Sequence, residues 1–144
     1  MSSDAQLEAF AVHSTDKLRY CDSDPQGHVN NAVFSTFLET GRVDILYRGE
    51  GRIVDDGCAF VIARLEMDFR AELKWPGTVE IGTRIQKIGR TSITLEQAVF
   101  QNGVLAASAL SVVVQMNQME RTPQPLSEMA RERLGRLQSL PAAA

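Results

Sequence analysis

Residues 19–31 read RYCDSDPQGHVNN, a segment dense in turn-forming residues that leads into a periodic apolar stretch. Asp, Ser, Pro and Gly together favour a turn. Pro25 fixes its own φ and lacks a backbone N–H, so no regular element should run through it. Asn30 and Asn31 follow, and asparagine is a strong helix N-cap because its side chain accepts from the free N–H groups of the first turn. The segment therefore predicts a helix that begins near Asn30 or Asn31.

The stretch after Asn31 has the spacing of a helix with one buried face. Its apolar residues recur at helical intervals; they are Val33, Phe34, Phe37, Leu38, Ile45 and Leu46. Gly41 lies in the same stripe. Because an interior glycine costs a helix about 1 kcal/mol relative to alanine, we expect a sheet to approach closely there. Gly49, Gly51 and the turn at residues 55–57 should end the helical region.

From Cys58 the apolar pattern changes to a period of two, which is typical of half-buried antiparallel strands. The residues expected on the buried face are Val61, Ala63, Leu65, Met67 and Phe69, then Val79, Ile81, Thr83 and Ile85, then Ile93, Leu95, Gln97 and Val99. Turns are expected at residues 75–77, at 89–90 and at Asn102-Gly103, a pair that favours a type I′ hairpin. Val104 to Met116 predicts a last long strand, with residues 110–114 buried on both faces.

The two ends of the chain carry weaker signals. Residues 1 to about 13 are expected to form a loose leader, followed by a short first strand at Lys17 to Cys21. Ser127 should cap a short C-terminal helix over about 127–138. The sequence thus predicts one α+β domain over residues 1–144, in which a curved antiparallel sheet of about five strands wraps a long central helix. A dimer would cover the free edge strand and the second sheet face.

Composition narrows the class of protein. The chain has 144 residues, 44% of them hydrophobic, and a formal charge of -3, values that suit one globular domain and argue against general affinity for nucleic acid or membranes. No stretch approaches the roughly 20 apolar residues of a membrane span, and a cytoplasmic location is expected. The two cysteines should be reduced. No recognised zinc spacing is present, so no metal site is expected.

The first motif resembles the signature of the 4-hydroxybenzoyl-CoA thioesterase-like family, an Asp-x-Asp-x-x-Gly-His-Val-Asn-Asn segment that enters a long helix. Glu39 and Arg42 also match a recurrent Glu-x-x-Arg in that helix, and residues 89–92, Gly-Arg-Thr-Ser, resemble the family's turn between the third and fourth main strands. The resemblance implies a hot-dog fold and hydrolysis of an acyl-CoA, or of an acyl-carrier protein thioester, without a cofactor. It also implies a homodimer or homotetramer with the site between subunits.

The resemblance assigns the catalytic carboxylate to the second Asp of the motif, Asp24, and the polarising backbone amide to Asn31. A carboxylate can activate water as a general base or attack the thioester carbonyl as a nucleophile, and the sequence leaves both routes open. Asp22 is the competing carboxylate, but we expect it to make local backbone hydrogen bonds. His28 is expected to orient Asp24 or to contact the thioester, unless its ring only bonds to backbone.

A carboxylate inside the helix offers another catalytic candidate. Glu39 points about 140° away from Phe34 and is interpreted as the ion-pair partner of Arg42, three residues further on. The remaining substrate contacts are expected at the mouth of the site, in an apolar acyl pocket and, through cationic side chains, at the CoA phosphates. The mouth is expected to include Gly27 and Asn30. The acyl pocket is expected to be lined by Phe34, Cys58, Phe60 and Val61, and the phosphates are expected to contact Lys87 and Arg90. Each of the apolar residues could instead be simple core, and each cation a solvated turn residue.

Two other functions stay open on the same fold. A hot-dog acyl-CoA hydratase or dehydratase needs a paired His and carboxylate for proton transfer, and Asp24 and His28 are separated by three residues here. A non-catalytic acyl-binding module is the third interpretation, because fold alone does not fix function. Release of free thiol from acyl-CoAs distinguishes a thioesterase from both a hydratase and an acyl-binding module.

Overall fold

The computed structural model describes residues 6–48 and 52–139 of the chain. Its regular elements, in chain order, are η1 (Leu7–Ala9), β1 (Val12–Lys17), η2 (Tyr20–Asp22), α1 (Asn31–Tyr47), β2 (Cys58–Phe69), β3 (Thr78–Ile88), β4 (Ser92–Gln101), β5 (Val104–Asn117), β6 (Thr122–Pro123) and α2 (Glu128–Ser139). The helix-ending signals at Gly49 and Gly51 lie outside the described residues.

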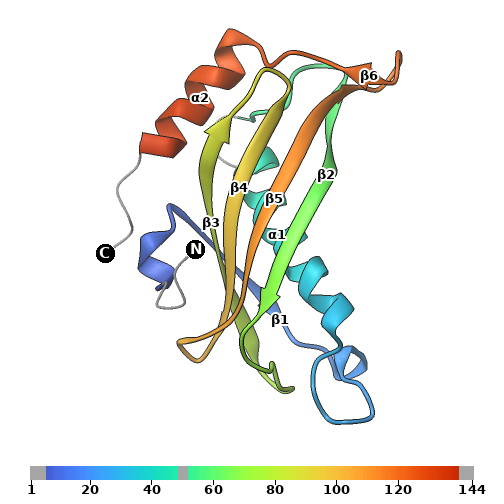
Figure 1. Ribbon diagram of the computed structural model, residues 1–144, viewed down its shortest axis with the longest axis vertical. Helices are drawn as coiled ribbons and strands as arrows, with labels where there is room; N and C mark the ends of the chain where they lie inside the picture. The colour runs from blue at the N-terminus through green and yellow to red at the C-terminus, as the bar shows by residue number, and fades with distance from the viewer. Residues whose placement is uncertain (1–5, 49–51, 140–144) are drawn as a thin grey trace.

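The strands form one antiparallel sheet in the order β1-β3-β4-β5-β2, and the two-residue β6 pairs with β5. Figure 1 shows the long strands curling around α1, with α2 at one end of the sheet. The predicted α+β architecture, a long helix wrapped by a curved sheet of five main strands, is confirmed. Because the order ends in β1 and β2, these two strands are the edges of the sheet.

The start of α1 follows the predicted capping. Asn30 is the N-cap, and the Ala32 N–H donates to its side-chain oxygen at 2.9 Å. Leu38 and Leu46 are among the buried residues of α1, as the helical spacing predicts. Gly41 lies against the sheet so closely that a Cβ atom there would be 2.6 Å from Thr83 Oγ1 and 2.7 Å from Gln97 Nε2. The expected close approach at Gly41 is therefore confirmed.

A β-bulge changes which residues of β2 face the helix. The pairing of β2 with β5 shifts between Ile62 and Arg64. A bulge inserts one extra residue, so side chains before and after it alternate out of phase. Phe60 packs against the core on one side of the bulge, and Leu65 and Met67 do so on the other. The single alternation predicted from residue 61 to residue 69 is wrong for the first part of β2.

The N-terminal segment is more ordered than predicted. Phe10 is fully buried, and its ring covers Gly82, where a Cβ atom would come within 2.5 Å of it. The first strand is Val12–Lys17, paired with β3, whereas residues 20–22 form a 3-10 turn. The prediction of a loose leader through residue 13 and a strand at 17–21 is therefore wrong, because pairing with β3 outweighs a weak local pattern. Residues 1–5 lie outside the described part.

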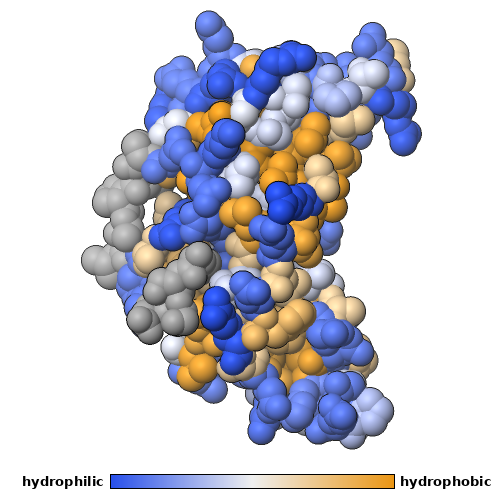
Figure 2. Space-filling model, in the orientation of Figure 1, coloured by the Kyte–Doolittle hydropathy of each residue, from blue (hydrophilic) through white to orange (hydrophobic). Residues whose placement is uncertain are grey.

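The C-terminal half follows the prediction with one exception. Asn102 and Gly103 both have positive φ, 51° and 78°, as a type I′ turn requires. Ser127 caps α2, since its Oγ accepts from the Ala130 N–H at 3.1 Å. The run 110–114 in β5 is not buried on both faces, because buried and half-buried residues alternate along it. Figure 2 shows hydrophobic residues gathered over β5 and the edge strand β2, interrupted by hydrophilic ones.

Candidate active site

The loop that enters α1 is held in one shape by backbone hydrogen bonds. The Asp24 N–H donates to the His28 carbonyl at 2.8 Å, and the Gly27 N–H donates to the Asp24 carbonyl at 3.0 Å. Ser23 and Val29 form an isolated antiparallel bridge. Gly27 has φ +83°, a conformation that glycine adopts at little cost. The motif therefore builds a tight turn that presents Asp24 and His28 at the start of the helix.

Asp22 is the buried anchor of this loop. Only 2% of its side chain is exposed. One carboxylate oxygen accepts from the Arg19 backbone N–H at 2.8 Å, and the other accepts from Arg19 Nη2 at 2.8 Å and Nε at 3.1 Å. Burial raises the pKa of Asp22, but the hydrogen bonds from Arg19 outweigh it, so the pKa lies below its usual value. Asp22 thus stays ionised with both oxygens occupied.

Asp24 is half-buried and has one free oxygen. Its Oδ1 accepts from the Gln26 N–H at 2.9 Å and, more weakly, from the His28 N–H at 3.3 Å. Within residues 6–48 and 52–139, Oδ2 has no hydrogen-bond partner. The backbone of His28, not its ring, therefore orients the Asp24 carboxylate.

A cleft of about 500 Å³ opens beside Asp24. Its lining residues are Asp24, His28, Val29, Asn30, Asn31, Phe34, Phe69, Ala71 and Glu72. Phe34 and Phe69 meet edge to face with ring centroids 5.1 Å apart. Phe69, at the end of β2, is 53% exposed despite its size. The sequence pattern assigned Phe69 to the core, and no local signal marked it as part of the site.

The first residue of α1, Asn31, lines this cleft. The Ala32 N–H is bound by the Asn30 side chain and the Val33 N–H by the Asn30 carbonyl at 2.9 Å. In the described part of the chain the Asn31 N–H has no acceptor. An unpaired N–H at a helix N-terminus carries partial positive charge. Asn31 therefore brings an unused donor to the lining of the cleft.

The imidazole of His28 lies next to a carboxylate that sequence reasoning missed. His28 Nε2 is 3.1 Å from Glu72 Oε2, and Glu72 is also 4.0 Å from Lys74 Nζ. Glu72 lies between β2 and β3, in a segment without a motif. Only the tertiary pairing of this segment with the motif loop brings it to the cleft, so no sequence signal could have identified it.

The β2 residues predicted to bind substrate lie far from Asp24 within the same chain. The Phe60 N–H donates to the hydroxyl of Tyr47, the last residue of α1, at 3.0 Å. A helix rises about 1.5 Å per residue, which places Tyr47 roughly 24 Å from Asn31. Cys58 and Val61 flank Phe60 in β2. The structure therefore does not bring these three residues to the Asp24 cleft of their own chain.

The predicted phosphate ligands also lie at that distant end. Lys87 and Arg90 are exposed at the β3–β4 turn. The Arg90 carbonyl accepts from the Leu126 N–H, just before α2. Figure 1 places this turn beside α2, at the end of the sheet opposite the start of α1.

The expected ion pair between Glu39 and Arg42 is not formed. Among the described residues Glu39 has no ion-pair partner within 4.0 Å and is exposed. Arg42 instead turns toward the sheet, where Nη1 donates weakly to Gln97 Oε1 at 3.4 Å and Ser111 Oγ at 3.5 Å. Burial lowers the pKa of Arg42, and the charge of Glu39 opposes this only in part. The prediction is wrong because the sheet offers Arg42 buried acceptors.

Residues 6–48 and 52–139 contain neither a metal-binding cluster nor a membrane-spanning helix. No group of three or more His, Cys, Asp or Glu side chains is placed to hold a metal ion. No helix in this part of the chain is long and apolar enough to cross a membrane.

Comparison with known proteins gives a consistent result. The family model described as thioesterase-like superfamily matches residues 18–134. A thioesterase from Thermus thermophilus, solved with coenzyme A and Zn, is 36% identical with a TM-score of 0.81, over 93% of this chain and 98% of that one. A predicted thioesterase from Bacillus stearothermophilus is 27% identical with a TM-score of 0.76, over 90% and 98%.

A more distant structure shares the fold alone. The DHNA-CoA thioesterase from Staphylococcus aureus is 18% identical, with a TM-score of 0.80 over 89% of this chain and 91% of that one. No curated protein sequence matches the chain significantly.

Proposed function

Since the chain belongs to the thioesterase-like superfamily and is a hot-dog thioester hydrolase, we propose that it hydrolyses acyl-CoA thioesters in the cleft beside Asp24. One observation carries the proposal. As far as the described residues show, the same cleft holds a carboxylate with an unpaired oxygen, an unpaired helix N-terminal amide and an apolar wall. These are the three groups that hydrolysis of an apolar acyl thioester requires.

Asp24 supplies the reactive oxygen in this mechanism. As a general base, its free Oδ2 takes a proton from water while the water oxygen attacks the carbonyl carbon. As a nucleophile, the same oxygen attacks directly and water then cleaves the acyl-enzyme. In both routes the carbon–sulfur bond breaks, the electron pair leaves with sulfur, and the thiolate takes up a proton. The geometry at Asp24 supports either route.

Asn31 is the donor for the negative charge that develops on the carbonyl oxygen. Its N–H is unpaired and is oriented by the N-terminal end of α1, where the helix dipole favours negative charge. A preorganised donor of this kind is worth far more to the transition state than a solvated one. The cap formed by Asn30 fixes where the helix begins and hence where the Asn31 amide lies.

The acyl group would lie against Phe34 and Phe69. An exposed Phe69 beside a buried Phe34 leaves an aromatic surface open within the cleft. Burying apolar acyl carbons there gains about 25 cal/mol per Å². The coenzyme A in the Thermus thermophilus relative supports CoA as the carrier of the acyl group.

A homodimer would complete the site. Edge strand β2 exposes Val61 (44%) and Ile62 (48%), and an open apolar edge favours pairing with another strand. A two-fold pairing of β2 with its own copy is antiparallel, so the Cys58 end of one protomer would approach the Phe69 end of its partner. That arrangement would bring Cys58, Phe60, Val61, Lys87 and Arg90 of the partner toward the Asp24 cleft.

The test is release of free thiol from aromatic and aliphatic acyl-CoAs of graded length. We expect Asp24→Asn to stay folded and to lose at least about 100-fold in kcat, the usual contribution of a general base. Glu80→Gln is the control, because Glu80 is an exposed carboxylate of β3 that lies outside both the cleft and edge strand β2. Thiol release at the wild-type rate by Asp24→Asn would remove the proposed role. No release by the wild-type protein, with water addition to an enoyl-CoA, would favour a hydratase.

A further inference from the structure

We propose that Glu72 is a positioning residue that holds the imidazole of His28 at the thioester, an inference that rests on the proposed function. Glu72 Oε2 is 3.1 Å from His28 Nε2, and both residues line the cleft that contains Asp24. A carboxylate attracts an imidazole most strongly when the ring is protonated. The contact therefore holds the ring in the cleft at one of its two nitrogens.

The backbone fixes Glu72 relative to His28. Leu73 follows Glu72 and is fully buried, and its carbonyl accepts from the N–H of Val29, the residue after His28, at 2.9 Å. The two segments are thus tied together one residue away from the Glu72–His28 contact. This hydrogen bond sets the register that places the two side chains opposite each other.

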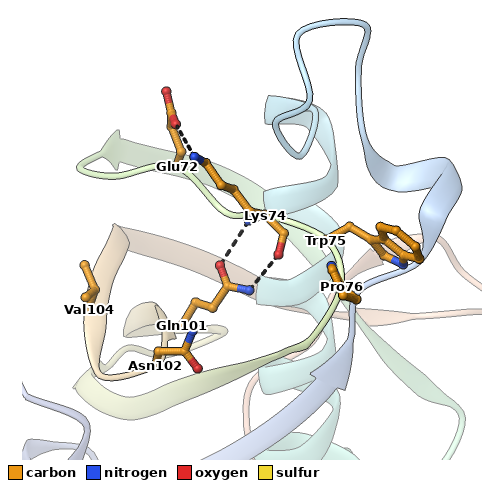
Figure 3. Close-up of a pocket in the computed structure, with 7 residues that line it drawn as sticks. All are labelled: Glu72, Lys74, Trp75, Pro76, Gln101, Asn102 and Val104. Atoms are coloured by element: carbon orange, nitrogen blue, oxygen red, sulfur yellow. Dashed lines mark hydrogen bonds and ion pairs between the residues drawn. The ribbon is translucent and has the colours of Figure 1, made fainter.

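Two further hydrogen bonds hold the next residue of this segment, Lys74. The Lys74 N–H donates to Gln101 Oε1 at 3.0 Å, and Gln101 Nε2 donates back to the Lys74 carbonyl at 2.8 Å. Figure 3 shows this two-way contact between the connection and the end of β4. The Trp75 ring meets the Tyr20 ring edge to face at 5.1 Å. The carboxylate is therefore carried by a connection that is anchored at the three residues directly after it, 73 to 75.

The contact between His28 and Glu72 contributes little to folding stability. The side chain of His28 is 35% exposed and that of Glu72 is 54% exposed, and exposed ion pairs contribute little to the free energy of unfolding. Lys74 Nζ lies 4.0 Å from the same oxygen, Glu72 Oε2, and Figure 3 shows this ion pair. Glu72 Oε2 thus lies within ion-pair distance of both His28 and Lys74.

This arrangement gives His28 a specific task. With Nε2 facing Glu72, Nδ1 is the ring nitrogen left for the substrate, and it has no partner in the described part of the chain. When the ring carries a proton on both nitrogens, Nδ1 can donate to the carbonyl oxygen or to the departing sulfur, which needs a proton once the carbon–sulfur bond has broken. Glu72 does not touch the reacting atoms and acts through His28.

Kinetics of Glu72 variants on the best acyl-CoA test this inference. We expect Glu72→Gln, which keeps the shape and removes the charge, to lower kcat about tenfold with KM within about twofold, because a positioned acid or base contributes at least that much. Glu72→Asp should keep more of kcat than Glu72→Gln, because it keeps the carboxylate. Glu80→Gln is the control, since Glu80 is exposed and its strand neighbours Val79 and Ile81 are buried.

A double-mutant cycle separates positioning from a general loss of structure. In a His28→Ala background, Glu72→Gln should have no further effect, because two residues that act through one contact are not additive. The inference is overturned if Glu72→Gln turns over at the wild-type kcat, or if its loss is as large without His28 as with it.

A spectroscopic measurement keeps the inference testable without turnover. The chain has two histidines, His13 and His28, so the imidazole NMR signals are assigned with one His28→Ala sample. We expect the His28 ring signals to move in Glu72→Gln and to stay unchanged in Glu80→Gln. Should the wild-type protein hydrolyse no acyl-CoA, the proposed function fails, but the Glu72–His28 contact is still judged here. Unmoved His28 signals in Glu72→Gln would overturn it.

Discussion

The two carboxylates of the motif differ in what surrounds them rather than in their chemistry. Asp22 is buried with both oxygens bonded to Arg19, whereas Asp24 is half-buried in a cleft and has one oxygen without a partner among residues 6–48 and 52–139. A residue whose oxygens are all occupied can shape a loop, and one with a free oxygen can react. One turn thus contains, two positions apart, a carboxylate that holds the loop and the carboxylate that we propose to be catalytic.

At the same scale, Gly41 sets how closely helix and sheet can pack. A Cβ atom at Gly41 would lie 2.6 Å from Thr83 Oγ1 and 2.9 Å from Ile81 Cγ2. Alanine favours a helix by about 1 kcal/mol over glycine, but forcing a methyl group into a packed interface costs about 1–3 kcal/mol or more. We expect Gly41→Ala to lower the free energy of unfolding in urea by about 1–2 kcal/mol.

Gly135 provides the matched control for this substitution. It lies inside α2 with nothing within 4 Å of an added Cβ. Gly135→Ala should therefore raise the free energy of unfolding by up to about 1 kcal/mol. Equal changes in the free energy of unfolding for Gly41→Ala and Gly135→Ala would contradict the close approach of α1 to the sheet.

Among the elements, Asp55 links three parts of the chain. It follows α1, and its carboxylate accepts from Gln115 Nε2 of β5 at 2.9 Å and from the Ser127 N–H and hydroxyl before α2 at 3.0 and 2.5 Å. Burial raises the pKa of Asp55, but the hydrogen bonds from Ser127 and Gln115 outweigh it, so the pKa lies below its usual value. A single side chain thus joins the connection after α1, β5 and the N-cap of α2.

The lowered pKa of Asp55 gives stability a defined pH dependence. A carboxyl group with a folded-state pKa below its unfolded value stabilises the fold above the unfolded pKa, near 3.9, and loses this effect as pH falls through the folded pKa. We expect Asp55→Asn to lower the free energy of unfolding at pH 7 by about 2 kcal/mol. Its stability should also change less than that of the wild type between about pH 5 and pH 2. A variant with the wild-type pH profile would show that Asp55 is not linked to folding.

The elements also show which predictions depend on local chemistry. The start of α1 at Asn30 and the hairpin at Asn102-Gly103 were predicted correctly, because each is fixed by the residues that form it. The strand β1 was misplaced, since its residues 12–17 owe their conformation to pairing with β3. Glu72 was missed for the same reason, because it reaches His28 only through the contact of Leu73 with Val29. Non-local pairing leaves no periodic signal in the sequence.

For the molecule as a whole, edge strand β2 is the surface on which a partner subunit would pack. Its edge position and the exposure of Ile62 leave apolar surface beside α1. The five predicted substrate contacts at the far end of the sheet would reach an Asp24 cleft only from a partner subunit. Dimerisation and activity should then be lost together.

A charge at the edge strand tests this coupling. We expect Ile62→Glu to be monomeric by light scattering, because a two-fold axis through β2 would place two buried carboxylates near each other, at a cost of several kcal/mol. Its kcat/KM should fall in proportion to the loss of dimer and recover in part at high protein concentration. Met129→Glu is the control, since Met129 is 50% exposed on α2, away from β2. A monomeric Ile62→Glu with wild-type kcat/KM would show that one protomer holds the complete site, and the distant residues Lys87 and Arg90 would then have no part in binding CoA.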